Sequence, residues 1–201
     1  TRFRNVTGVQ TCALPIYGLT QAVLDRRKTQ TRRMCKEQHW AFSDLVNAKY
    51  GIFHFDIPKY EVGEVVAVAQ SYKDCGYGAD APDRSPKDYR IVRGTLGESK
   101  GWNNKMFVWV DACKHRIRIT NVRVERLQAI TDADCMAEGV EKVKECENLY
   151  RVPIYHKSGR ITYISADTPH EAYAALIDRI SGKGTWERNP WVFVYDFELI
   201  K

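Results

Sequence analysis

A strict alternation of large apolar side chains occupies residues 191–199 and constrains the fold more than any other part of the sequence. Because successive side chains of a strand point to opposite faces, this period of two predicts a β-strand. One face would carry Trp191, Phe193, Tyr195, Phe197 and Leu199, and the other would carry Val192, Val194, Asp196 and Glu198. The aromatic face is more typical of a packed core than of a platform for stacked bases, so we expect this strand to close a sheet.

A second long strand is predicted over residues 115–127, with a change of parity inside it. Ile117 and Ile119 share one face, whereas Val122 and Val124 have the opposite parity. The change predicts a bulge or bend near Thr120 or Asn121. Further strands are predicted at residues 65–69, which are apolar enough to be buried on both faces, at 105–110, and in a hairpin of 152–155 with 161–164 turned at Ser158 and Gly159.

Capping residues predict helices between these strands. Thr131, with acidic residues directly after it, opens a short helix that Gly139 ends, and Thr168 followed by proline opens a longer one. Leu19, Ala22, Val23 and Arg26 fall at helical spacing and predict a third helix. Separate strands and helices indicate an α+β fold, and the bent strand is typical of a small barrel.

Composition narrows the class of protein. The chain has 201 residues, 44% of them hydrophobic, which is typical of one domain with long loops. No apolar run reaches the ~20 residues that cross a bilayer, and no signal peptide is recognisable, so we expect no membrane and a cytoplasmic location. The six cysteines form no CxxC pair, so we expect neither a metal site nor another cofactor. The net charge of +6 favours acidic partners such as nucleic acids.

The first sixteen residues look foreign to the protein. Residues 6–16 (VTGVQTCALPI) can be encoded by a nucleotide string that looks like a common sequencing-library adapter. We therefore interpret residues 1–16 as a disordered, non-native segment and residues 17–201 as a single domain. The raw nucleotide record tests this interpretation, because different codons across residues 6–16 would remove it.

Residues 25–33 (DRRKTQTRR) carry the densest chemistry of the chain, with five cations and two hydroxyls. The predicted helix ends there, and arginines suit the negative pole of its dipole. In the extended chain that follows, Thr29, Thr31 and Arg33 would share one face, and Gln30 and Arg32 the other. We expect the first of these faces to line a cleft and the second to flank it.

Glu138 is an unusual residue for its place in the predicted helix. It lies in the last turn, where a carboxylate opposes the helix dipole at a cost of roughly 0.3–1 kcal/mol. Two readings stay open: a partner outside the helix offsets this cost, or Glu138 is exposed and the cost is negligible.

Four motifs occur in an order that resembles the ASCH domain: KTxTRR at residues 28–33, VGEVV at 62–66, ITxxDxxAEG at 130–139 and NPWVFVYxFE at 189–198. The resemblance is to the larger versions carried by phages and prophages. It implies a PUA-like fold, a small mixed β-barrel with two or three flanking helices. Insertions would then fall at about residues 36–60, 74–103 and 141–165.

The resemblance implies two kinds of function. Most members of the family are predicted RNA-binding modules, and some small bacterial ones are amidohydrolases that remove the acyl group from N4-acetylcytidine. In these enzymes a Lys and a Thr of the KTxT turn work with a downstream Glu. By motif they correspond to Lys28, Thr31 and Glu138. The chain departs from the family at Arg26, where many members have Gly, so this position needs another turn geometry or some strain.

We therefore carry three hypotheses, and composition with the family's majority favours the first. The chain binds RNA, single-stranded nucleic acid or a modified nucleotide or nucleoside, with an aromatic residue, Trp102 or Tyr72, stacking on a base. The nucleic-acid-binding residues would be Arg27, Lys28, Thr29, Arg32 and Arg33. Alternatively the chain is a metal-independent amidohydrolase for N4-acetylcytidine, which needs the pKa of Lys28 to fall far below the ordinary value of about 10.4. The third hypothesis is a structural or interaction protein of phage or prophage origin.

Overall fold

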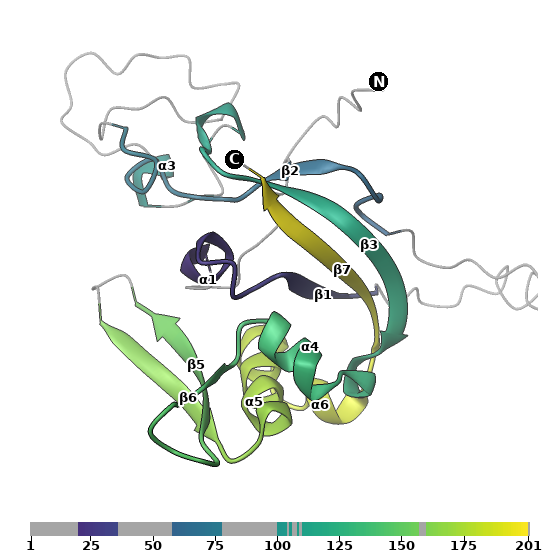
Figure 1. Cartoon of the computed structure of the whole chain (residues 1–201). Coiled ribbons are helices and arrows are strands. Elements are labelled where there is room, and N and C mark those ends of the chain that lie inside the picture. Colours follow the sequence, from purple (N-terminus) through teal and green to yellow (C-terminus); the bar gives the residue numbers. More distant parts are fainter. Residues whose placement is uncertain are drawn as a thin grey trace, which may run out of the picture.

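The computed structural model describes residues 20–35, 58–77, 100–103, 105, 108, 110–156 and 160–200. In this part the chain is an α+β protein built on an antiparallel sheet that is curled into a half-barrel (Figure 1). The expectations for residues 1–16, and most of those for 36–60 and 74–103, concern residues outside the described ranges.

The curled sheet has four strands in the order β1-β7-β3-β2. Their bounds are Gln30–Met34 for β1, Val65–Ala67 for β2, Arg116–Arg126 for β3 and Trp191–Ile200 for β7. Every described pair in the sheet is antiparallel, whereas the family resemblance predicted a mixed barrel. The long strands β3 and β7 bend together and give the sheet its curl (Figure 1).

The bend in β3 is where the change of parity predicted it. Ile119 pairs with Phe197 and Asn121 pairs with Asp196, so one extra residue of β3 is inserted between two successive residues of β7. Such a bulge bends the strand and increases its twist. Because of the bulge, Ile117 and Ile119 before it and Val122 and Val124 after it face the same side of the sheet.

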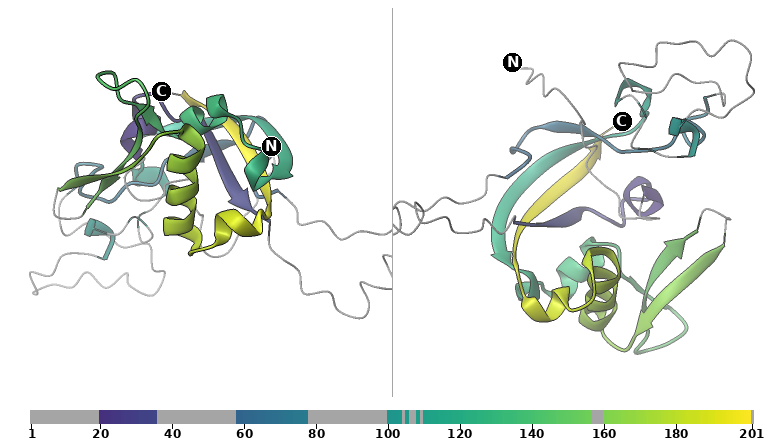
Figure 2. Two further views of the ribbon diagram at one scale, coloured as in Figure 1. Left: turned by 90° about the horizontal axis from the view of Figure 1, so that it is seen from below. Right: turned by 180° about the vertical axis from the view of Figure 1, so that it is seen from behind.

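A smaller sheet of three strands lies beside the helices, in the order β4-β5-β6. Its strands are Glu141–Lys142 (β4), Tyr150–Tyr155 (β5) and Ile161–Ala166 (β6). The predicted hairpin is confirmed, but its turn at residues 157–159 lies outside the described ranges. Figure 2 shows α5, Pro169–Ser181, next to this hairpin.

Both predicted caps are confirmed. The Thr131 hydroxyl accepts from the Asp134 N–H to open α4, Asp132–Ala137, and the Thr168 hydroxyl accepts from the Glu171 N–H to open α5. The remaining helices are α1 (Thr20–Leu24), α3 (Lys100–Asn103) and α6 (Thr185–Arg188), with short 3-10 turns at Val110–Ala112 and Leu127–Ala129. No helix among the described residues is long and apolar enough to span a membrane.

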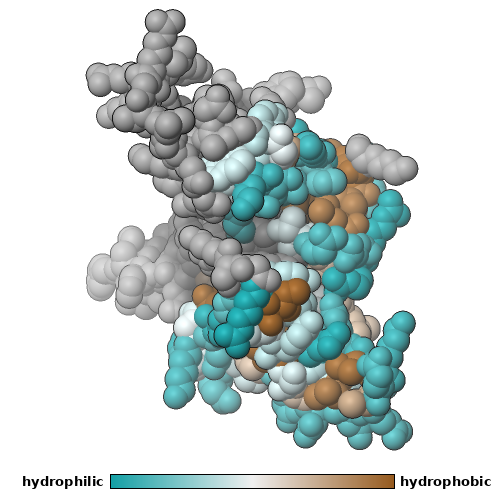
Figure 3. All heavy atoms as spheres, turned by 90° about the vertical axis from the view of Figure 1, so that its left-hand side faces the viewer, coloured by the Kyte–Doolittle hydropathy of each residue, from teal (hydrophilic) through white to brown (hydrophobic). Residues whose placement is uncertain are grey.

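Strand β7 divides two hydrophobic clusters. Its aromatic face packs into one cluster with Val23 of α1, as the alternation predicted. Its other face, through Val192 and Val194, packs into a second cluster with α4, α5 and the hairpin. Trp191 at the start of the strand is the exception, since it is 49% exposed. On the face drawn in Figure 3, hydrophobic residues form separate patches between hydrophilic ones.

Two strand predictions need correction. The described residues within 105–110 form no strand, and a 3-10 turn begins at Val110 instead. There Val108 packs into a small separate cluster, so its apolar character reflects burial and not a strand. The strand at 65–69 is confirmed only for Val65–Ala67, and Val65 is 49% exposed rather than buried.

Candidate functional site

Three elements hold the turn that carries Lys28. The N–H groups of Arg27 and Lys28 donate to the same carbonyl of α1, at 2.8 and 2.9 Å. The Thr29 N–H donates to the Ala137 carbonyl at the end of α4 at 2.9 Å, and the Thr29 carbonyl accepts from the Phe197 N–H of β7 at 2.8 Å. The backbone around Lys28 is therefore fixed against α1, α4 and β7.

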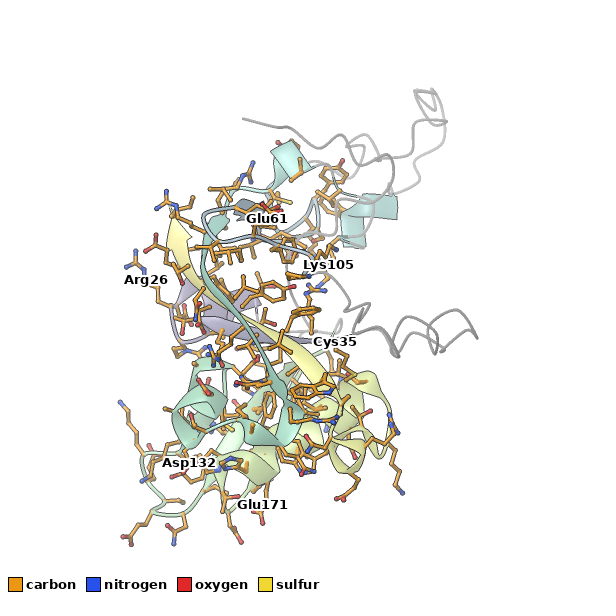
Figure 4. All side chains as sticks on the ribbon, turned by 90° about the vertical axis from the view of Figure 1, so that its right-hand side faces the viewer. Arg26, Cys35, Glu61, Lys105, Asp132 and Glu171 are labelled. Carbon is orange, nitrogen blue, oxygen red and sulfur yellow. The ribbon has the colours of Figure 1, made fainter. Side chains whose placement is uncertain are left out.

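Arg26 adopts a left-handed backbone, at a position where the ASCH resemblance led us to expect either another turn geometry or strain. Its φ is 60°, a region where a Cβ atom crowds the backbone and where glycine is favoured. Figure 4 shows its side chain pointing away from the body of the molecule. The turn thus keeps a glycine-like geometry, with strain at Arg26.

Replacing Arg26 with glycine is expected to stabilise the fold. The strain energy that glycine relieves exceeds the extra conformational entropy that it gives the unfolded chain. We therefore expect a gain in the free energy of unfolding of about 0.5–1 kcal/mol and a rise in Tm of roughly 2–4 °C, measured by thermal unfolding. The matched variant is Arg179→Gly on the exposed side of helix α5, which is expected to lose stability instead. A loss in both variants would mean that Arg26 carries no strain.

Lys28 and Glu138 form a buried ion pair. The Lys28 Nζ donates to Oε2 of Glu138 at 2.5 Å and to the backbone carbonyl of Glu138 at 2.9 Å. The two side chains are 0% and 3% exposed. The ammonium ion therefore satisfies both the carboxylate and the negative end of α4. Of the two readings of Glu138, the one with an outside partner is confirmed and the exposed one is wrong.

The surroundings of Lys28 weaken its hold on the proton. Burial lowers the pKa of Lys28 below its usual 10.5, while the Glu138 carboxylate opposes this shift and the charges of Arg32 and Arg33 add to it. The net direction is downward because the lost hydration of a fully buried ammonium ion outweighs a single carboxylate partner. Lys28 is thus closer to losing its proton than an exposed lysine is.

Arg32 ties the pair to the sheet. Its side chain is 1% exposed, and it donates to Oε1 of Glu125 through Nε and Nη2 at 2.9 and 2.7 Å. Its Nη1 donates to the Gln30 side chain at 2.5 Å and to Oε1 of Glu138 at 3.3 Å, and its Nη2 reaches Asp134 at 3.2 Å. Each nitrogen of the guanidinium has a carboxylate or amide partner.

An outer ring of half-buried polar groups surrounds Arg32. Gln30 donates to Asp134 at 3.0 Å and to Asp196 at 2.6 Å, and Arg123 donates to Asp196 at 2.8 Å. Burial tends to raise the pKa of Asp134, but hydrogen bonding from Gln30 and the charge of Arg32 leave it below its usual value. These contacts favour the ionised form of Asp134 beside the buried pair.

Side chains alternate along β1 as predicted, but the face that meets Glu138 is the one that carries Gln30 and Arg32. Arg32 reaches Glu138 and Gln30 contacts Arg32 on the same face, whereas Thr31 lies opposite Tyr195 on the other face of the sheet. Among the described residues, the Thr31 hydroxyl makes no hydrogen bond to Lys28 or Glu138, although Thr31 is buried. Arg33, on the Thr31 face, lies over the Tyr60 ring at 5.8 Å. The structure therefore joins Lys28 to Glu138 but not to Thr31.

The other predicted binding residues are placed differently. Arg27 is 37% exposed and pairs with Asp25 at 3.1 Å and with Glu141. Tyr72 is only 1% exposed, so its ring is not open to a base, and Trp102 packs partly buried against the same small cluster. Arg27 therefore keeps part of its charged side chain in solvent, whereas Tyr72 is buried and Trp102 is partly buried.

Sequence reasoning missed Tyr173 of α5, which looked like one residue of an apolar helix face. It is 1% exposed, and its hydroxyl has no partner of normal hydrogen-bond geometry among the described residues. Burial, and then the nearby Glu138 carboxylate, raise the pKa of Tyr173 well above 10. No signal in the sequence distinguishes this tyrosine from a core residue.

Within the described ranges, no three His, Cys, Asp or Glu side chains gather in a way that could hold a metal ion. Comparisons of the chain with models of known protein families, with curated proteins and with solved structures found no match.

Proposed function

We propose that the chain is an ASCH domain of PUA-like fold that hydrolyses the amide bond of an N4-acylated cytidine. The buried contact between Lys28 and Glu138 carries the proposal, because these are two of the three residues that correspond to the family's hydrolytic set. The order of the four motifs and the curled antiparallel sheet support the fold.

Burial favours a catalytic role for Lys28 over phosphate binding. Lys28 and Arg32 are almost completely buried and already donate to carboxylates, so a phosphate would have to displace those partners. A buried ion pair contributes little stability compared with well-packed apolar side chains. A lysine with a lowered pKa next to a buried carboxylate is, in contrast, the arrangement from which general acid–base catalysis is built.

The short contact allows the pair to exchange one proton. Moving it from Lys28 Nζ to Glu138 Oε2 turns the ion pair into a neutral amine and a neutral carboxylic acid. Burial of both groups favours this exchange because it removes two buried charges, whereas Arg32 at 3.3 Å from Glu138 opposes it. The amine is then a base, and the carboxylic acid is an acid.

These two groups are sufficient for amide hydrolysis. The Lys28 amine takes a proton from water while the water oxygen bonds to the acyl carbon, giving a tetrahedral oxyanion. The C–N4 bond then breaks as N4 takes the proton from the Glu138 carboxylic acid. The products are cytidine and the free acid, and the pair is again an ammonium ion and a carboxylate, ready for the next cycle.

Activity on N4-acetylcytidine is expected to have a bell-shaped pH dependence, because the pair must hold one proton between its two groups. A second proton on the acid side removes the base, and loss of the shared proton on the alkaline side removes the acid. Since the pKa of Lys28 is lowered, the alkaline limb should fall below 10.5. Initial rates of cytidine release across pH measure this profile. A rate that is flat up to pH 11 would exclude the proton shared by Lys28 and Glu138 as the acid of the reaction.

Binding of RNA or single-stranded nucleic acid is the second candidate, favoured by exposed groups beside the site. Arg26 is exposed, and Arg151 stacks on the Tyr163 ring at 4.5 Å. Glu141 contacts both Arg27 and Arg151, so the basic turn and the hairpin form one surface. Cations and an aromatic ring that is 48% exposed are suited to phosphates and bases.

Salt dependence separates this candidate from hydrolysis of a free nucleoside. If the surface binds RNA, affinity for a single-stranded oligonucleotide should fall steeply as salt rises, and Arg27→Met should reduce the slope by about one phosphate contact. Arg179→Met is the matched exposed control. Affinity that does not change with salt would exclude phosphate contacts.

A further inference from the structure

Tyr173 comes from helix α5 and lies near the buried pair of Lys28 and Glu138. It is on α5, which packs against α4, and Glu138 directly follows α4. Its ring packs in the cluster beneath these helices, edge-to-face with Trp186 at 6.3 Å between ring centres. The packing fixes the ring, and the Glu138 carboxylate lies near enough to the hydroxyl to raise the pKa of Tyr173.

The Tyr173 hydroxyl lies near Glu138 but meets no acceptor at normal hydrogen-bond geometry among the described residues. Both oxygens of Glu138 already have partners, since Oε2 accepts from Lys28 at 2.5 Å and Oε1 lies 3.3 Å from Arg32. The hydroxyl itself has no partner of normal geometry among the described residues, although it is almost completely buried. Buried hydroxyls are nearly always paired in native proteins, so an unpaired one next to reactive groups indicates a group that a ligand completes.

We infer that the Tyr173 hydroxyl donates a hydrogen bond to the acyl oxygen of the substrate and stabilises the oxyanion that forms there. This inference rests on the proposed amidohydrolase function and adds a catalytic residue to it. Its chemistry fits the position. The pKa of the phenol is raised well above 10 by burial and by Glu138, so the hydroxyl keeps its proton at any pH at which the pair works.

The bond changes leave the phenol intact. As water bonds to the acyl carbon, the electron pair of the C=O bond moves to oxygen, and the phenol O–H donates to that oxygen without giving up its proton. When the C–N4 bond breaks, the C=O bond forms again and the hydrogen bond weakens. A donor aimed at developing charge in this way increases the rate by roughly 10²–10³.

Tyr195 supplies a matched control, because it is another buried tyrosine whose hydroxyl has a structural partner. Its oxygen accepts a hydrogen bond from the Lys59 N–H at 2.8 Å, in the cluster on the other side of β7. Tyr195→Phe should therefore lower stability and leave kcat unchanged. Tyr173→Phe should leave stability unchanged and lower kcat, since it removes an unpaired hydroxyl from the core and a donor from the site.

The experiment measures kcat for N4-acetylcytidine, its pH profile and the urea midpoint for the wild-type chain, Tyr173→Phe and Tyr195→Phe. The expected result for Tyr173→Phe is a kcat about a hundredfold lower, with the limbs of the pH profile and the urea midpoint preserved. Unchanged kcat would overturn the role of Tyr173 while leaving the hydrolysis in place. A lower kcat with a displaced alkaline limb would place the hydroxyl on Glu138 and overturn its contact with substrate. No hydrolysis by the wild-type chain would overturn the proposed function and this role together.

Discussion

Lys28→Met is expected to destabilise the fold by about 3 kcal/mol. Removing one member of a buried ion pair leaves the other charge buried without its partner, which commonly costs about 3–5 kcal/mol. The lower end applies here, because Glu138 would keep Arg32 as a neighbour at 3.3 Å. Urea unfolding measures the change as a lower midpoint with an unchanged slope.

The control for this variant is Lys144→Met, since Lys144 is an exposed lysine of the segment after α4. Its stability should stay within about 0.5 kcal/mol of the wild type. The double variant Lys28→Met with Glu138→Gln should lose less free energy of unfolding than the two single variants lose in sum, because neither charge of the pair then remains. Equal stability of Lys28→Met and Lys144→Met would mean that the buried pair does not form.

Glu138→Gln is expected to lower kcat for N4-acetylcytidine by about 10²–10⁴. The amide side chain keeps the size of Glu138 but cannot take the proton from Lys28 or give one to N4. The rate should be measured well below the unfolding midpoint of the variant, because this change also breaks the ion pair. Glu147→Gln, at an exposed glutamate, is the matched control and should keep the wild-type rate.

Patterns that depend on neighbouring residues predicted local structure well. The caps at Thr131 and Thr168 rely on contacts within three residues, and both form as expected. The alternation at residues 191–199 and the change of parity in β3 were also sufficient to predict the strand and its bulge. The prediction for 105–110 failed because the described apolar residues Val108 and Val110 pack in a small cluster without strand partners.

The site was predictable only in part, because it depends on how distant segments pair. Glu138 was found from its unfavourable place at the helix end, and its partner Lys28 from the family motif. The alternation along the basic turn was predicted correctly, but the face that meets Glu138 was not, because the pairing of β1 with β7 decides which side chains face α4. Tyr173 could not be found, since a buried hydroxyl looks no different in sequence from a core aromatic.

The most direct test of the central claim is the incubation of the folded wild-type chain with N4-acetylcytidine, with chromatographic detection of both products. The paired chemistry of Lys28 and Glu138 predicts cytidine and acetate in equal amounts, formed faster than in buffer and much faster than with Glu138→Gln. No cytidine from the folded wild-type chain, under conditions where a known amidohydrolase converts the same substrate, would contradict it.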